Sequence, residues 1–276
     1  MRLLHGRPLL AGAAVLPLRA RAAILVDGGD GRVLWAKQPH LRLPVASTTK
    51  IMTALLVLQR LPLESTIRIG WTVPRVPLVR EGLRSGERVP AWKLLYGLLL
   101  YSGNDDALAL AIATSGNRGA FIGLMNREAA RLGLHDSHFT SPSGVIDDGN
   151  YSSAWDLAAL GRYAMRDPRF RTIVRTRRKE VTWAAPTNAK LYLNKNRLLT
   201  LYPGAIGIKT GWTMAAGECL LFEATHGQRT LIGVVLDSAP TKTGAIFSDA
   251  ARLLNWGFGV HHAVTVPRPP AGVPAE

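Results

Sequence analysis

Cysteine is almost absent from this chain of 276 residues, in which Cys219 stands alone. A single cysteine cannot form an internal disulfide, and its apolar neighbourhood ECLLFEA predicts a small buried side chain rather than a reactive thiol. The fold must therefore depend on its hydrophobic core. With 47% hydrophobic residues, the chain is long enough for one large domain or two small ones.

Acidic residues are also scarce, because 19 Asp and Glu oppose 34 Lys and Arg and leave a formal net charge of +15. Such an excess suits an anionic partner, such as nucleic acid, a membrane surface or an acidic cell-wall polymer. Apart from RTRRK at 175–179 the basic residues are scattered, and no nucleic-acid motif accompanies them. We therefore expect a solvated basic surface and no nucleic-acid partner.

Hydrophobic runs of transmembrane length are missing as well. The N-terminal stretch MRLLHGRPLLAGAAVLPLRARA has a basic start, a short apolar stretch over 9–18 and an A-x-A site at 20–22. This layout predicts a signal peptide over residues 1–22 with cleavage after Ala22, and its apolar stretch is too short to span a bilayer comfortably. We expect an exported, extracytoplasmic protein of the cell wall or periplasm, without a firm membrane anchor.

Strand patterns lie near both chain ends, with helical patterns between them. Residues 23–37 predict a hairpin, and residues 47–59, apolar on nearly every face, predict a buried helix. Further helices are predicted over 92–103, 104–116, 121–133 and 152–167, strands over 198–213, 217–227 and 228–238, and a closing helix over 244–258. We expect an α/β (α+β) fold: one antiparallel sheet built from both chain ends and flanked by helices. The folded domain would span 23–260, with a helical subdomain inserted over roughly 62–195 and a Pro-rich mobile tail over 261–276.

Ser47 and Lys50 lie three residues apart on the first turn of the buried helix, so their side chains share a face. Burial can depress the pKa of a lysine by about 3–5 units, which would let Lys50 act as the general base that activates the Ser47 hydroxyl. The alternative is a chance S-x-x-K in which Lys50 extends to water.

Ser102 and Asn104 lie in YSGND, between two predicted helices. There the hydroxyl can relay a proton and the amide can hold a substrate backbone. The alternative is a simple helix break, in which Asn104 or Asp105 caps the second helix.

Lys209, Thr210 and Gly211 lie in the strand pattern AIGIKTGWT. A cation and a hydroxyl suit a substrate carboxylate, and glycine permits close approach of a ligand backbone. A second copy, Lys242-Thr243-Gly244, is expected to open the closing helix and so lacks this strand geometry.

The three motifs gain specificity from their order, because Ser102 follows Ser47 by 55 positions and Lys209 follows Ser102 by 107. Class A β-lactamases and penicillin-binding proteins carry S-x-x-K, S-D-N and K-T-G in this order. The sequence resembles the serine-type D-alanyl-D-alanine carboxypeptidases, the low-molecular-mass penicillin-binding proteins of the penicilloyl serine transferase superfamily. The stretches that carry the resemblance are ILVDGGDGRVLWAK, ASTTKIMTALLVL, LLYGLLLYSGND, MNREAARLG, SHFTSPSGV, YSSAWDLAAL, GIKTGWT and LLNWGF.

The resemblance implies a β-lactamase/transpeptidase-like catalytic domain that removes the terminal D-alanine from peptidoglycan stem pentapeptides. It implies that Ser47 is acylated, that Lys50 is its base and that Ser102 assists proton transfer. Asn104 would orient the peptide, and Lys209 and Thr210, beside Gly211, would engage the terminal carboxylate. The backbone N–H groups of Ser47 and Trp212 would form the oxyanion hole. β-Lactam antibiotics would acylate the same serine, and no metal or organic cofactor is implied.

Three positions depart from the family pattern. Ser141 stands in SHFTSPSGV where Asn is frequent. Asp106 stands where a small residue commonly follows SGND, and we expect it to add charge close to the site. Many relatives carry an Arg that helps to hold the substrate carboxylate, roughly where this chain has Ile246, so that Lys242 or Arg252 would have to substitute.

Other functions remain open at this point. A serine β-lactamase would use the same acylation groups, but class A enzymes need a glutamate for deacylation, and no E-x-x-L-N motif lies between Ser102 and Lys209. A non-catalytic cell-wall-binding relative would account for the missing Arg and the positive charge, although all three motifs are intact. HDSH at 135–138 has two His without a third ligand nearby, which favours loop packing over a metal site.

Overall fold

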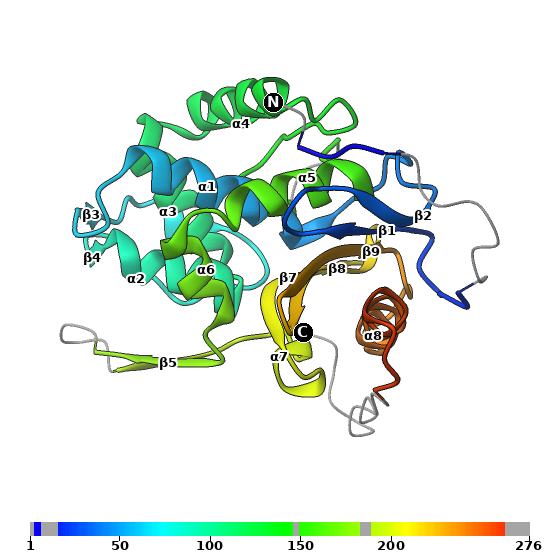
Figure 1. The fold of residues 1–276 in the computed structure, drawn as a ribbon. Coiled ribbons are helices and arrows are strands. Elements are labelled where there is room, and N and C mark those ends of the chain that lie inside the picture. Colours follow the sequence, from blue (N-terminus) through cyan, green and yellow to red (C-terminus); the bar gives the residue numbers. More distant parts are fainter. Residues whose placement is uncertain (1–2, 7–15, 146–148, 183–188, 263–276) are drawn as a thin grey trace.

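The computed structural model describes residues 3–6, 16–145, 149–182 and 189–262 (Figure 1). Its centre is an antiparallel sheet of five strands in the order β2-β1-β9-β8-β7. The first two come from the N-terminal part of the chain, β1 (Ala22–Asp27) and β2 (Val33–Lys37). The other three come from the C-terminal part, β7 (Ala205–Thr213), β8 (Gly217–His226) and β9 (Arg229–Leu236). The expected sheet built from both chain ends is therefore confirmed, with β7 at one edge.

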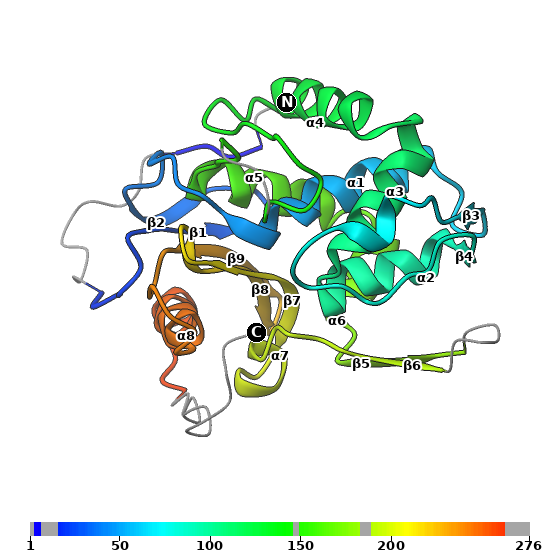
Figure 2. The ribbon, with the colours of Figure 1, turned by 180° about the vertical axis from the view of Figure 1, so that it is seen from behind.

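Helices cover both faces of this sheet (Figures 1 and 2). Helix α8 (Ala245–Phe258) packs on one face against β8 and β9, and α5 (Ala154–Ala164) packs on the other against β1 and β9. Because both faces are covered, eight consecutive residues of β8 are buried instead of alternating with exposed ones. This explains why GECLLFEA lacks an alternation of apolar and polar residues, with Cys219 buried as expected.

The inserted region is less purely helical than predicted. It follows η1 (Ala46–Thr49) and α1 (Lys50–Arg60) and contains, besides α5, the helices α2 (Ala91–Tyr96), η3 (Gly97–Tyr101), α3 (Asn104–Ser115), α4 (Arg118–Leu132) and α6 (Pro168–Arg175). It also contains η2 (Val73–Arg75) and two hairpins, β3 (Thr66–Arg68) with β4 (Arg88–Pro90) and β5 (Arg178–Val181) with β6 (Lys190–Leu193). The β5–β6 hairpin projects from the body of the molecule (Figures 1 and 2).

The predicted strand over 198–213 was too long at its start. Residues Leu198–Leu201 form a short helix, α7, and β7 begins at Ala205. The side chain of Asn196 accepts a hydrogen bond from the Leu198 N–H at 3.1 Å, which satisfies one of the donors at the start of the helix. An Asn side chain that bonds backbone locally competes with strand pairing, and the apolar pattern alone did not show this.

Residues 16–22 belong to the packed structure. Leu18 and Ala20 are buried among side chains of α8, and Ala22 pairs with Leu236 inside the sheet. The fully buried carboxylate of Asp249 accepts the N–H of Arg19 at 3.1 Å and that of Ala20 at 2.8 Å. A buried carboxylate needs such donors, so this segment satisfies a group in the core of α8.

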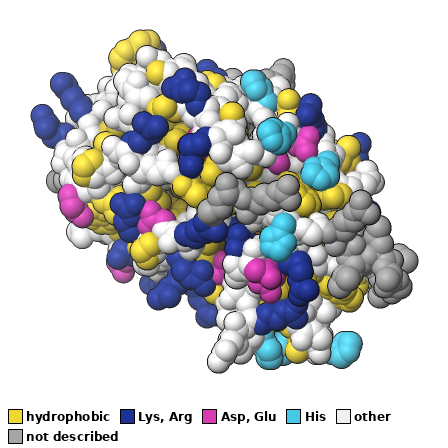
Figure 3. Space-filling view, turned by 45° about the horizontal axis from the view of Figure 1, so that its top comes forward, with side chains coloured by type: hydrophobic (Ala, Val, Ile, Leu, Met, Phe, Trp, Pro, Cys, Tyr) yellow, Lys and Arg dark blue, Asp and Glu magenta, His cyan; other side chains and the backbone are white. Residues whose placement is uncertain are grey.

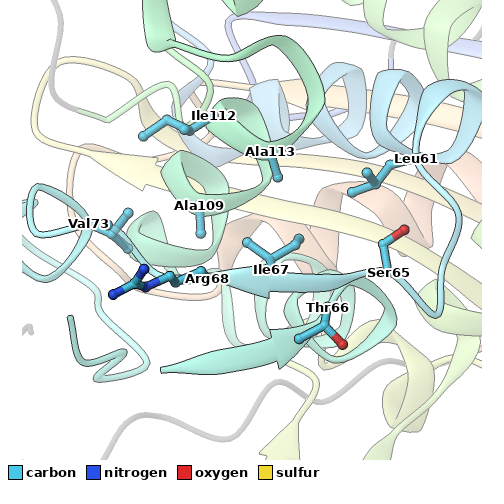
Figure 4. Close-up of a pocket in the computed structure, with 10 residues that line it drawn as sticks. Leu61, Ser65, Thr66, Ile67, Arg68, Val73, Ala109, Ile112 and Ala113 are labelled. Carbon is cyan, nitrogen blue, oxygen red and sulfur yellow. The ribbon is translucent and has the colours of Figure 1, made fainter. Parts of the chain in front are cut away.

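A cavity of about 290 Å³ lies between β3 and α3, lined mainly by apolar side chains such as Ile67, Val73 and Ala109 (Figure 4). None of the motif residues lines it. On the face drawn in Figure 3, Lys and Arg side chains are spread out and acidic ones are few, in keeping with the net charge of +15. Within the described residues no single helix is long and apolar enough to cross a membrane. Helices α3 and α4 taken together would be long and apolar enough, but they are bent by 85° relative to each other.

Candidate active site

Ser47 and Lys50 lie at the junction between η1 and α1, and their side chains meet. Lys50 is the first residue of α1, and its Nζ lies 2.8 Å from Ser47 Oγ. Ala46, directly before Ser47, has a φ of +47°, a conformation that L-residues rarely adopt and that is often found at functional sites. The predicted sharing of one helical face is therefore present, and Lys50 does not extend to water, because its exposed fraction is 0%.

Lys50 has three polar neighbours, which either protonation state of its amine can satisfy. Besides Ser47 Oγ, its Nζ lies 2.9 Å from Asn104 Oδ1 and 3.2 Å from the carbonyl oxygen of Ser143. A neutral amine has two N–H donors, which the amide and carbonyl oxygens accept, and one lone pair, to which the Ser47 hydroxyl can donate. The arrangement can therefore take the hydroxyl proton directly.

Burial and neighbouring cations favour this neutral form. Burial is the largest cause that lowers the pKa of Lys50 well below its ordinary value, and the charges of Lys209 and Lys195 lower it further. The charges of Asp106 and Asp105 raise the pKa of Lys50, but by less than burial and the two lysines lower it. Lys195 was not singled out from the sequence; it lies over the Tyr101 ring, 4.6 Å from its centroid, next to Ser102.

The Ser102–Asn104 turn joins η3 to α3 and faces Lys50 through Asn104. Ser102 is in the left-handed region with φ +74°, and its N–H and that of Gly103 both donate to the carbonyl of Gly97. Asn104 does not cap α3, because its Oδ1 accepts from Lys50 and its Nδ2 donates to the carbonyl of Pro77 at 3.1 Å. The backbone N–H of Asn104 donates to Val79 at 2.8 Å, so the loop before α2 holds this turn in place.

Strand β7 passes directly beside the Ser47 turn. A Cβ added to Gly211 would lie 2.9 Å from the carbonyl oxygen of Val45 and 3.1 Å from the backbone nitrogen of Ser47. Glycine thus permits a close approach that brings the Gly211–Trp212 backbone beside Ser47. Lys209 is buried in the same strand and donates to the carbonyl of Thr210 at 3.0 Å; burial, aided by the charge of Lys195, lowers the pKa of Lys209 to about 7.

A third wall of the site was not predicted. The loop over 141–144 supplies the Ser143 carbonyl that Lys50 approaches, and the Gly144 N–H donates to Ser141 Oγ at 2.9 Å. A Cβ on Gly144 would collide with the carbonyl of Ala46 and with Thr49. The loop is therefore packed tightly on the Ser47 turn. Its sequence is part of SHFTSPSGV, which carries the resemblance, but a backbone carbonyl leaves no residue-type signal from which its contact with Lys50 could be predicted.

The second Lys-Thr-Gly opens α8, as predicted. Glu218 holds it there, because its carboxylate accepts the N–H groups of Gly244 and Ala245 at 2.7 Å and 2.9 Å. The ammonium of Lys242 lies 4.6 Å from the centroid of the Trp212 ring, next to β7.

Of the two residues that could replace the missing Arg, Lys242 lies beside β7 and Arg252 does not. Arg252 donates to the carbonyl of Pro17 at 3.0 Å, in contact with the segment before β1, whereas Lys242 lies beside Trp212. Ile246 is buried among apolar side chains of α8 and the sheet. Asp106 lies close to the site, as expected, because its charge acts on Lys50, but its carboxyl is fully buried and faces Glu81.

Comparisons with known proteins show the family of this chain. Residues 11–240 match peptidase family S11, D-alanyl-D-alanine carboxypeptidase. A D-alanyl-D-alanine carboxypeptidase of Streptomyces sp. (strain K15) is 39% identical over 252 residues, which are 85% of this chain and 86% of that relative.

Two solved structures have the same fold. The D-alanyl-D-alanine carboxypeptidase of Mycobacterium tuberculosis H37Rv superposes with a TM-score of 0.85 at 33% identity, covering 96% of this chain and 100% of that one. The Streptomyces K15 DD-transpeptidase superposes with a TM-score of 0.81 at 37% identity, covering 88% of this chain and 98% of that one. With the family shown over most of its length, this chain belongs to the D-alanyl-D-alanine carboxypeptidases, serine peptidases of family S11.

Proposed function

We propose that Ser47 is the nucleophile of this carboxypeptidase and that neutral Lys50 is its general base. The observation that carries the proposal is the 2.8 Å contact of a fully buried Lys50 Nζ with Ser47 Oγ. Ser47 attacks the penultimate D-alanine carbonyl of a peptidoglycan stem pentapeptide, terminal D-alanine leaves, and water resolves the acyl-enzyme. Ser102 assists the transfer of the proton to the leaving amine, and Asn104 orients both Lys50 and the peptide.

Groups on β7 take part in binding both negative charges of the reacting peptide, the oxyanion of the attacked carbonyl and the terminal carboxylate. The N–H groups of Ser47 and Trp212 stabilise the oxyanion, which the close packing of Gly211 on the Ser47 turn supports. Lys209 and Thr210 engage the terminal carboxylate. A carboxylate next to Lys209 favours its protonated form, so binding of the substrate restores the charge that burial disfavours in the free enzyme.

Labelling with a fluorescent penicillin tests the assignment of the nucleophile. We expect a stable adduct with the wild type and none with Ser47→Ala, while Ser65→Ala, which removes a hydroxyl from the cavity beside β3, is labelled normally. Labelling of Ser47→Ala would contradict the assignment. An unlabelled but folded wild type would favour a cell-wall-binding protein, and rapid nitrocefin turnover without D-alanine release would favour a β-lactamase.

A second candidate function is acyl transfer to an amine instead of water, because the similar Streptomyces K15 protein is a DD-transpeptidase. Both reactions use the same acyl-enzyme and differ only in the acceptor. Incubation with a diacyl-Lys-D-Ala-D-Ala tripeptide and an excess of glycylglycine separates them by mass spectrometry. The carboxypeptidase assignment predicts mainly the shortened, hydrolysed peptide; mainly the glycylglycine adduct would favour transfer.

Lys242 is the residue that we propose in place of the expected Arg. It lies beside the strand that carries Lys209 and Thr210, and a charge-assisted hydrogen bond to a carboxylate contributes about 1.5–3 kcal/mol. We therefore expect Lys242→Met to lower kcat/KM about tenfold or more for a peptide with a free terminal carboxylate. Lys179→Met, which removes a cation from the face of Tyr96 on the β5 side, serves as control. An equal loss with a penicillin whose carboxylate is esterified would show that Lys242 does not act through the carboxylate.

We also propose that the protein acts outside the cytoplasm, in the cell wall or periplasm, where peptidoglycan lies. The basic surface suits an anionic cell-wall polymer. The contacts of Arg19 and Ala20 with Asp249 and the pairing of Ala22 favour processing of a leader before Leu18 over the predicted cleavage after Ala22. The mass of the exported protein decides between the two positions.

A further inference from the structure

Two carboxyl groups face each other in the core directly behind the Ser102–Asn104 turn. A Cβ added to Gly97 would collide with both Glu81 Oε2 and Asp106 Oδ1, and one added to Gly103 would collide with Asp106 Oδ2. Both groups are buried, Asp106 completely. The pair therefore fills the space beside Gly103, which lies in the turn, and Gly97, whose carbonyl accepts the N–H groups of Ser102 and Gly103.

Few of the oxygens of this pair receive a hydrogen bond from elsewhere. Glu81 Oε2 accepts from the Tyr192 hydroxyl of β6 at 2.6 Å, whereas Glu81 Oε1 and both oxygens of Asp106 have no other donor among the described residues. Two buried carboxylates at such close range cannot both be ionised. A single proton held between them satisfies the contact, because the protonated Asp106 can donate to the Glu81 carboxylate.

The charged groups around the pair do not remove this need for a proton. Asp105 adds negative charge, but its carboxylate is occupied by the N–H groups of Glu81, Gly82 and Leu83. Lys190 donates to the backbone carbonyl of Glu81 at 2.5 Å, and its charge lowers the pKa of Glu81 less than burial raises it. Lys50 and Lys93 are the other cations that act on the pair, and the pKa of each is itself lowered, first of all by burial.

The pair connects the elements that hold Asn104. Asp106 lies in the first turn of α3, two residues after Asn104, and Glu81 lies in the loop whose Pro77 and Val79 carbonyls bind Asn104. Repulsion between two ionised carboxylates would push this loop and α3 apart. Asn104 would then lose its anchors, and Lys50 would lose the Asn104 Oδ1 that fixes its amine beside Ser47.

We propose that Glu81 and Asp106 share one proton and thereby act as positioning residues that hold Asn104 in place for acylation of Ser47. Loss of this proton at alkaline pH loosens the turn and lowers the rate of acylation. The activity part of this inference depends on the proposed role of Ser47, whereas the effect on stability does not.

The sign of the stability effect follows from proton linkage. Burial raises the pKa of Glu81 to about 7 and that of Asp106 well above its ordinary value. The folded protein therefore binds more protons than the unfolded chain, so its stability falls as pH rises from about 4 through these raised values. Asp106→Asn and Glu81→Gln each replace the shared proton by an amide N–H and remove this dependence.

The test measures both quantities between pH 5.5 and 10 for the wild type, Asp106→Asn and Glu81→Gln. We expect an alkaline loss of the penicillin acylation rate in the wild type that moves up by about one pH unit or more in both variants. We also expect the wild-type Tm to fall more steeply than theirs from pH 6 to 9, by on the order of 5 °C. Glu180→Gln neutralises an exposed carboxylate of β5 and should behave as the wild type.

The acylation rate and the Tm together distinguish a failure of this proposal from a failure of the proposed role of Ser47. A wild-type alkaline limb that both variants retain, or a rate lowered by the same factor at every pH, would overturn the proposal. If Ser47 is not acylated at all, the proposed function fails, but the difference in the pH dependence of Tm must still be present. Equal Tm slopes in all four proteins would show that the pair does not hold a proton.

Discussion

Lys50→Arg should lower the rate of penicillin acylation by about 10²- to 10⁴-fold, the contribution of a general base. Arginine keeps the positive charge but stays protonated at any working pH, so it cannot accept the Ser47 proton. In the structure Lys50 Nζ is fully buried and 2.8 Å from Ser47 Oγ, which leaves no room for a water molecule to act as the base between them. Stopped-flow measurement of adduct formation gives the rate.

The larger guanidinium could also disturb the fold, so two further variants accompany it. Lys50→Met removes the amine without adding volume and should lose acylation to a similar extent. Lys93→Arg makes the same exchange at another buried lysine, which donates to the carbonyl of Thr182, and should leave the rate within a few-fold of the wild type. Near-normal acylation by Lys50→Arg or Lys50→Met would remove Lys50 from the role of base.

Gly211→Ala should be the second most damaging change, with a loss of about 10²- to 10³-fold, the range found when one oxyanion-hole donor is removed. The new methyl group would lie 2.9 Å from the Val45 carbonyl oxygen and 3.1 Å from the Ser47 nitrogen, so β7 or the Ser47 turn must shift. A shift of either one separates the N–H groups of Ser47 and Trp212. The acylation rate constant and the Tm, measured together, distinguish this local effect from unfolding.

Gly70→Ala is the matched control, because a Cβ at Gly70 meets nothing within 4 Å. It should keep both the rate and the Tm of the wild type. Full activity of Gly211→Ala would mean that the backbone of β7 is not part of the oxyanion hole, and a Tm lowered together with the rate would assign the loss to folding.

Much of the site was predictable because three motifs carry their geometry in their spacing. Residues three apart at the start of a helix share a face, and this brought Ser47 and Lys50 together. A Lys-Thr-Gly inside a strand pattern predicted that Lys209, Thr210 and Gly211 lie in one strand, and the structure has them in β7 at the edge of the sheet. The close approach seen at Gly211 is that of the Ser47 turn, whereas the sequence predicted that of a ligand backbone. The buried character of Lys50 followed from the apolar helix around it.

The remaining parts of the site depend on contacts that cannot be predicted from residue types. The Ser143 carbonyl is a backbone group on a loop far from Lys50 in the sequence. Nothing in the sequence distinguishes Lys195 from the other lysines; only the fold shows that it lies beside the Tyr101 ring. The position of Asp106 close to the site was expected, but the sequence did not show that its carboxyl is buried against a second one. Only the fold reveals that Glu81, from a segment without regular structure, lies opposite it.

The fold itself was predicted well where periodicity was long and poorly where local hydrogen bonds decide. The five-stranded sheet and α8 matched their patterns, whereas α7 and the two hairpins of the inserted region did not. In short segments a single side chain, such as the Asn196 amide at the start of α7, can outweigh the apolar pattern.

The charge state of one side chain tests this account most directly. Selective labelling of lysine with ¹³C and ¹⁵N allows the Lys50 side chain to be titrated by NMR, with its signal assigned by its absence in Lys50→Met. Burial and the neighbouring cations predict that Lys50 titrates far below the ordinary lysine value of about 10.4 and is largely neutral at the pH at which the enzyme acylates. A Lys50 that titrates near 10.4 in the folded protein would contradict its role as the base.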